Sequence, residues 1–189
     1  MREVLEELVA QWRQGKSTAV GTVVSTYRSA PRPAGASMLV TSDERAVGSV
    51  SGGCVEGAVF ELGQQVLADD TPVLQRYGVS DDDAFTIGLT CGGIIDVFVE
   101  KVDPVSFPEL DEVAASVAAE EPVAVVTVVA HPDAERVGSA WWSGPTGTPA
   151  RWAPPVLMRR SLRTSSARSP LAERPPCTTV PKGSAAARA

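Results

Sequence analysis

The sequence is poor in the residues that build metal centres and disulfide frameworks. The 189-residue chain has three cysteines, at positions 54, 91 and 177, and a single histidine, His131. Structural zinc sites use closely spaced pairs of cysteine and histidine ligands, and this chain has no such pair. An odd and sparse set of cysteines also argues against a disulfide framework, so we expect thiols.

Long apolar runs are also missing. No stretch approaches the roughly 20 apolar residues that a membrane-spanning helix requires. The first fifteen residues carry three glutamates within their apolar pattern, whereas a secretory signal begins with basic residues and continues with an unbroken apolar stretch. We therefore expect a cytoplasmic protein with no membrane partner.

Positive charge is scarce in most of the chain. Residues 151–189 hold eight Lys and Arg against one acidic residue, a net of +7, and the total of −6 leaves −13 for residues 1–150. A body this acidic repels a phosphate backbone, which excludes nucleic-acid binding by the folded part.

Two nucleotide-binding signatures are absent or incomplete. No G-x-G-x-x-G occurs anywhere in the chain. Gly15-Lys16-Ser17 matches the end of a phosphate-binding loop, but Ala10 stands where that motif needs its first glycine. The predicted order, helix and then strand, is also the reverse of the order in a phosphate-binding loop.

Hydrophobic periodicity predicts an α/β fold of the mixed α+β kind, a single sheet-and-helix domain over residues 1–143. Apolar residues recur at helical spacing from Val4 to Trp12, and Gly15 then predicts the end of that helix. Further helices are expected at residues 55–68 and 108–120. Strands are expected at residues 18–26, 37–41, 46–50, 73–77, 94–100 and 123–129, and the last is apolar enough for burial on both faces.

The composition changes near residue 144. Six of the 15 prolines lie in residues 151–189, and the apolar residues there follow no period. Such a segment buries too little surface to offset its ordering entropy. We expect residues 144–189 to be an irregular tail rich in Pro, Arg and Ser.

The most informative feature is a pair of glycine-flanked cysteines, in Ser51-Gly52-Gly53-Cys54-Val55-Glu56 and in Thr90-Cys91-Gly92-Gly93. Paired glycines let a backbone approach a ligand closely, with its N–H groups unshielded. Cys54 is predicted at the start of a helix, where the dipole favours a thiolate and the amides can hold an anion. A thiolate suits a soft metal or sulfur chemistry.

Structural explanations stand beside these interpretations. Cysteine is often a buried small hydrophobe, and glycine pairs commonly serve turns alone. Glu56 either favours the helix dipole or acts as an acid–base group near the thiol. Arg28 and Arg32, in a proline-rich loop, are either solvated or suited to a phosphate or carboxylate.

Three blocks together resemble the N-terminal domain of the XdhC/CoxI family. They are SAPRPAGASMLV at residues 29–40, GSVSGGCVE at residues 48–56 and GLTCGGIIDV at residues 88–97. The resemblance is firm over residues 1–103 and fades towards residue 143. Members of this family are accessory proteins of molybdenum hydroxylases such as xanthine dehydrogenase and carbon monoxide dehydrogenase.

The resemblance implies a chaperone that binds molybdenum cofactor, protects it during sulfuration and inserts it into an apo-enzyme, without being an enzyme itself. It implies partners of that hydroxylase type, with a cysteine desulfurase and a second copy of the chain as further candidates. It also implies that Cys54 and Cys91 approach the molybdenum or its sulfur, and that Arg32 faces the cofactor's phosphate. The remaining implied cofactor-binding residues are Ser51, Gly52, Gly53, Glu56, Gly92 and Gly93.

The chain departs from the family pattern after residue 143. Family members typically continue into a Rossmann domain, and here the sequence turns to Arg, Pro, Ser and Ala. We interpret this change as a frameshift or a truncated reading. Three alternatives to a working chaperone therefore stay open: a thiol redox or persulfide-carrying enzyme using Cys54 and Cys91, a pure interaction domain, and a non-functional remnant.

Overall fold

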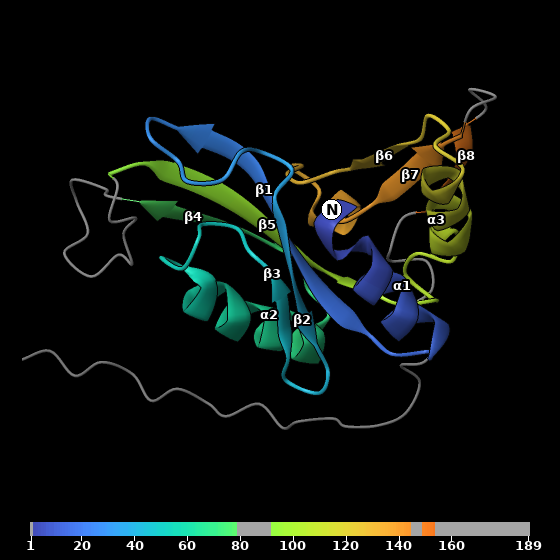
Figure 1. Ribbon diagram of the computed structural model, residues 1–189, viewed down its shortest axis with the longest axis horizontal. Helices are drawn as coiled ribbons and strands as arrows, with labels where there is room; N and C mark the ends of the chain where they lie inside the picture. The colour runs from blue at the N-terminus through green and yellow to red at the C-terminus, as the bar shows by residue number, and fades with distance from the viewer. Residues whose placement is uncertain (1, 79–91, 145–148, 154–189) are drawn as a thin grey trace, which may run out of the picture.

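A computed structural model describes residues 2–78, 92–144 and 149–153, the last of these by their backbone alone. Within these ranges the chain alternates strands and helices (Figure 1). In chain order the elements are η1 (Arg2–Val4), α1 (Leu5–Arg13), β1 (Thr18–Tyr27), β2 (Ser37–Thr41), β3 (Ala46–Gly48), α2 (Glu56–Asp69), β4 (Val73–Gly78), β5 (Ile94–Val102), α3 (Leu110–Ala118), β6 (Ala124–Thr127), η2 (Ala134–Arg136), β7 (Ala140–Ser143) and β8 (Pro149–Ala153).

The main sheet has five antiparallel strands in the order β3-β2-β1-β5-β4. Its two long strands, β1 and β5, pair from Thr18 opposite Val102 to Tyr27 opposite Ile94. A second, three-stranded sheet has the order β6-β7-β8. The predicted mixed α/β class is confirmed, with two sheets in place of the one that the sequence led us to expect.

Each face of the main sheet buries its own apolar cluster. Helix α2 covers one face, and α1, α3 and the second sheet lie on the other (Figure 1). Because strand side chains alternate between faces, Val23 and Val97 pack on the side of α2, whereas Val20 and Val102 pack against α1 and α3. Trp142 joins the second cluster from β7 and so ties the small sheet to the domain.

Helix α2 lies unusually close to the sheet at one glycine. A Cβ at Gly63 would lie 2.8 Å from a methyl carbon of Val40 on β2, a separation that real Cβ atoms essentially never show. Val40 is fully buried and branched at Cβ, so it has little freedom to move away. The absence of a side chain at residue 63 therefore sets the distance between helix and sheet.

Most predicted elements are confirmed, but the prediction for residues 123–129 is wrong in its burial. Strand β6 covers only Ala124–Thr127, and its residues alternate between exposed and half-buried. The physical reason is its place at the edge of the small sheet, where Val126 is 41% exposed. The apolar run reflects packing on one face rather than on two.

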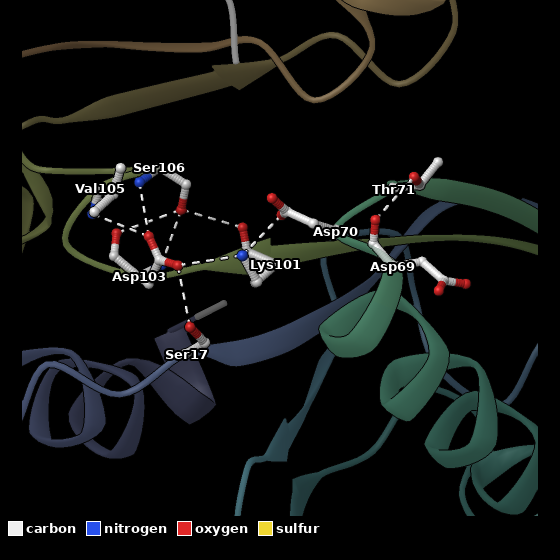
Figure 2. A network of polar contacts seen from close by, with 8 residues as sticks. All are labelled: Ser17, Asp69, Asp70, Thr71, Lys101, Asp103, Val105 and Ser106. Carbon is white, nitrogen blue, oxygen red and sulfur yellow. Dashed lines mark hydrogen bonds and ion pairs between the residues drawn. The ribbon is translucent and has the colours of Figure 1, made fainter. Parts of the chain in front are cut away.

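The segment that resembles the end of a phosphate-binding loop has a structural role. Ser17 donates a hydrogen bond of 3.1 Å to Asp103 Oδ2, and Lys101 lies between Asp103 and Asp70 at 3.6 and 2.9 Å (Figure 2). The other Asp103 oxygen accepts from the backbone amide of Ser106 at 2.8 Å. This network joins the start of β1 to the end of β5 and the end of α2.

Two further findings concern the helices and the C-terminal part of the described chain. No helix in the described part of the chain is long and apolar enough to cross a membrane. Strand β8 extends the small sheet beyond residue 144, where the tail was predicted to begin, so this part of the predicted tail is paired with β7.

Candidate functional site

The described parts of the three sequence blocks lie together at one end of the main sheet. There Tyr27 of β1 pairs with Ile94 of β5, so the loops leaving these strands lie together. A Cβ at Gly93 would lie 2.2 Å from the carbonyl oxygen of Ser29, and one at Gly52 would lie 3.9 Å from the Cβ of Pro31. The proline-rich loop therefore contacts both glycine-rich segments, and only a glycine fits at residue 93.

The loop before α2 is held by the carboxylate of Glu56. This side chain folds back from the first residue of the helix and accepts hydrogen bonds from hydroxyl and backbone donors. To Oε1 they come from Ser49 Oγ at 2.6 Å, Val50 N at 3.2 Å and Ser51 N at 2.9 Å, and to Oε2 from Ser51 Oγ at 2.5 Å, Gly53 N at 2.8 Å and Val55 N at 3.3 Å.

These donors keep Glu56 ionised. Partial burial acts to raise the pKa of Glu56, but hydrogen bonds from Ser49 and Ser51 outweigh it and lower the pKa to about 2. Carboxylates bonded by several N–H groups commonly titrate this low. Of the two interpretations that the sequence left open, the geometry favours a fixed anion at the helix start over an acid that exchanges protons near neutral pH.

The loop amides expected to meet a cofactor have internal acceptors. The amide of Gly53 donates to Glu56, and that of Gly52 donates to Ser49 Oγ at 2.9 Å. Glu56 thus takes the place that an external anion would occupy in this nest of N–H groups. Both glycines adopt positive φ, +76° and +116°, which an L side chain rarely adopts. In this conformation they shape the loop and leave space beside Cys54.

Cys54 is half-buried between the glycine pair and the helix. Its side chain packs against the apolar cluster under α2, as a structural cysteine does, but retains part of its surface. A Cβ at Gly53 would have no atom within 4 Å. The Cys54 thiol is therefore partly buried in the core and lies next to open space. This arrangement is compatible with a structural cysteine and with a cysteine that contacts a ligand.

The two arginines of the proline-rich loop have protein partners. Arg32 forms an ion pair with Glu3 at the N-terminus, and its side chain is 30% exposed. Arg28 lies 5.4 Å from the ring centre of Tyr27, in a cation–π contact at the surface. An anionic ligand would have to take Arg32 from Glu3, whose side chain is 58% exposed and whose ion pair is correspondingly weak.

The second cysteine block is described only in part. Cys91, like Cys177, lies outside the described residues, while Gly92 is exposed with φ of +70° and Gly93 is buried. Among the residues that the structure does describe, no three His, Cys, Asp or Glu side chains gather as metal ligands would. Arg32, Gly52, Gly93 and Cys54 are nevertheless all found at the same end of the sheet.

Sequence reasoning missed Ser49 and the anchoring role of Glu56. The Ser49 hydroxyl donates to the Glu56 carboxylate and accepts from the amide of Gly52. It therefore connects the start of α2 to the middle of the loop. The local sequence gives little signal for this role, since Ser49 and Ser51 do not stand three residues before Glu56 as a capping box requires. In this structure the glutamate makes most of the contacts.

Fold and site together define a mixed α/β domain with an anchored cysteine loop at one end of its main sheet. Comparison with known proteins gives a family match. Residues 11–78 match the model of the XdhC and CoxI family. The first two sequence blocks lie within the matched residues, and the resemblance inferred from them is confirmed.

Two curated relatives match comparable portions of the chain. A protein of Bacillus subtilis, described as a probable subunit of xanthine dehydrogenase, is 38% identical over 91 residues, 46% of this chain and 27% of the relative. The molybdenum cofactor insertion chaperone PaoD of Escherichia coli is 36% identical over 101 residues, 53% of this chain and 31% of the relative. The chain thus spans less than a third of the length of either relative.

A solved structure supports the fold. The crystal structure of a xanthine dehydrogenase from Bacillus halodurans aligns with a TM-score of 0.62 and 24% identity, over 86% of this chain and 49% of that chain. At this identity the likeness concerns the fold alone.

Proposed function

We propose that this chain is an accessory protein that binds molybdenum cofactor as cargo and helps to insert it into an apo-enzyme of the xanthine dehydrogenase or carbon monoxide dehydrogenase type. The match to the XdhC and CoxI family and the roles for which the two relatives are named support this function. In this role the protein is a maturation factor and turns over no substrate of its own.

The observation that carries the proposal is the anchored cysteine loop. Six hydrogen bonds to Glu56 fix the backbone on both sides of Cys54. A thiolate is the protein ligand best suited to a soft centre such as molybdenum bound by sulfur. A pre-set loop can present that thiolate without the entropic cost of ordering a flexible segment.

The remaining candidates take supporting roles in this proposal. Arg32, released from Glu3, binds the cofactor's phosphate with its planar guanidinium. Gly52, Gly53 and Gly92 keep the approach open, Gly93 allows the proline-rich loop to pack closely, and Ser51 holds the loop through Glu56. Cys91 supplies a second thiol. Sulfuration of the bound cofactor, with a cysteine desulfurase as the sulfur donor, and assembly as a homodimer belong to the same proposal.

Anaerobic binding of purified molybdenum cofactor tests the proposal. We expect the wild-type chain to bind the cofactor, Cys54→Ser to bind it at least about ten-fold more weakly, and Cys177→Ser, a matched control outside the three sequence blocks, to bind like wild type. Cys91→Ser shows whether the second thiol contributes. No binding by the folded wild-type protein would refute the chaperone function.

The same variants separate the thiol enzyme from the chaperone. A redox or persulfide-carrying enzyme requires a nucleophilic thiolate and predicts rapid alkylation at one of the two cysteines in the apo-protein. Slow alkylation of Cys54 and Cys91 together with tight cofactor binding supports the chaperone. Rapid alkylation without cofactor binding supports the thiol enzyme instead.

A further inference from the structure

A cavity of about 730 Å³ lies on the face of the main sheet opposite α2. It is partly open to solvent and is lined by residues of β1 and β5 on one side and of α1, α3 and β6 on the other. A volume of several hundred Å³ is typical of sites for small organic ligands. Its apolar walls include Leu5, Val24, Phe98, Val113, Val117 and Val125.

One wall carries a carboxyl group that has no partner among the residues that the structure describes. Glu100 lies on β5 opposite Val20 and lines the cavity. Within the described part of the chain it makes no hydrogen bond or ion pair, and burial raises its pKa to about 7. The side chain is half-buried, so its carboxyl lies in a largely apolar lining and can accept a charge-assisted hydrogen bond from a ligand.

The charges around the cavity select the kind of ligand. Besides Glu100, its lining includes Glu120 and Glu121 and a single cation, Arg2, and these three side chains are exposed at the rim. Three carboxyl groups against one guanidinium make the lining electronegative on balance. Such a lining repels anions and attracts a cation, and Coulomb attraction is strengthened where water is partly excluded.

We propose that this cavity is a second ligand site, separate from the cysteine loop, for a small organic cation with an apolar body. The ammonium or amidinium group of the ligand binds the Glu100 carboxylate, and the body lies against Val24, Phe98 and Val117. The site is separate because Cys54 packs into the cluster under α2, on the other face of the sheet.

The ionisation of Glu100 gives the site a pH signature. A bound cation favours the charged carboxylate, so binding lowers the pKa of Glu100 from about 7 and releases part of a proton near neutral pH. Affinity should therefore rise between pH 6 and pH 8, as the unliganded carboxyl loses its proton. The other charged groups of the lining are Arg2, Glu120 and Glu121.

The test compares 2-naphthylmethylamine with 2-naphthalenemethanol, its uncharged analogue of the same shape, by calorimetric titration of the full chain at pH 7.5. We expect the wild-type protein to bind the amine about ten-fold more tightly than the alcohol. Glu100→Gln should reduce this preference to below about two-fold. Glu112→Gln, an exposed carboxyl of α3 outside the cavity, should retain it.

Two results would overturn the proposal. One is that neither compound binds the folded wild-type protein, and the other is that Glu100→Gln leaves the preference for the amine unchanged. If Glu100→Gln fails to fold, titration of the wild type in two buffers of different ionisation enthalpy tests the same carboxyl. Proton release on binding the amine supports the site, and its absence refutes the role of Glu100.

Discussion

Removing the charge of Glu56 should destabilise the domain more than is usual for a half-buried side chain. Glutamine keeps the shape but offers one acceptor oxygen to a group of six donors, and it turns an N–H₂ towards them. The pKa of Glu56 falls from its usual 4.5 to about 2, which corresponds to about 3 kcal/mol at neutral pH. Partial exposure to solvent reduces the expected loss in Glu56→Gln to about 2 kcal/mol.

The same reasoning fixes the pH dependence. Because the pKa is lower in the folded state than in the unfolded state, the stabilisation by Glu56 is fully present above about pH 4.5 and is lost as the pH falls towards 2. Wild type should thus lose free energy of unfolding between pH 6 and pH 3.5, by about 1 kcal/mol from this group. Glu56→Gln should lack this component.

Urea unfolding, followed by circular dichroism at several values of pH, measures both effects. Glu61→Gln is the matched control, since Glu61 is an exposed carboxyl of the same helix. It should change the free energy of unfolding by less than about 0.5 kcal/mol. If Glu56→Gln were as stable as this control at pH 7, with the pH slope of wild type, the anchoring role assigned to Glu56 would be refuted.

Two further predictions concern packing and the polar network. Gly63→Ala should lower the free energy of unfolding by about 1 kcal/mol, because overpacking against Val40 outweighs the gain in helix propensity, whereas Gly57→Ala, which meets no atom within 4 Å, should be neutral or stabilising in the same urea titration. Asp103→Asn should cost about 1–2 kcal/mol, since it breaks the ion pair in the network of Figure 2, and Asp111→Asn, in an exposed ion pair, should cost less than about 0.5 kcal/mol. If Gly63→Ala and Gly57→Ala lost the same free energy of unfolding, the close packing of α2 on Val40 would be contradicted. If Asp103→Asn and Asp111→Asn lost the same amount, the contribution of the Asp103 network would be contradicted.

Local patterns in the sequence were sufficient for most of the elements. Apolar residues at helical spacing predicted α1 and α2, and β-branched runs predicted β1 and β5, because these preferences act within a few residues of the chain. The resemblance to the family also followed from the sequence, since three blocks at residues 29–40, 48–56 and 88–97 occur together and in order. Such features need no knowledge of distant contacts.

Tertiary structure decided what lies next to these elements. The apolar run of β6 could not show that it is an edge strand. Edge strands and central strands of a sheet differ in the strands that lie beside them, and the local sequence does not specify these. Glu56 had two open interpretations until the fold brought Ser49 and the loop amides around its carboxylate. In the sequence Glu100 is an ordinary polar residue of a strand, and its place in an apolar lining arises only where α3 and β6 lie over β5. Pairing, burial and cavities depend on residues far apart in the chain, and a local pattern carries no information about them.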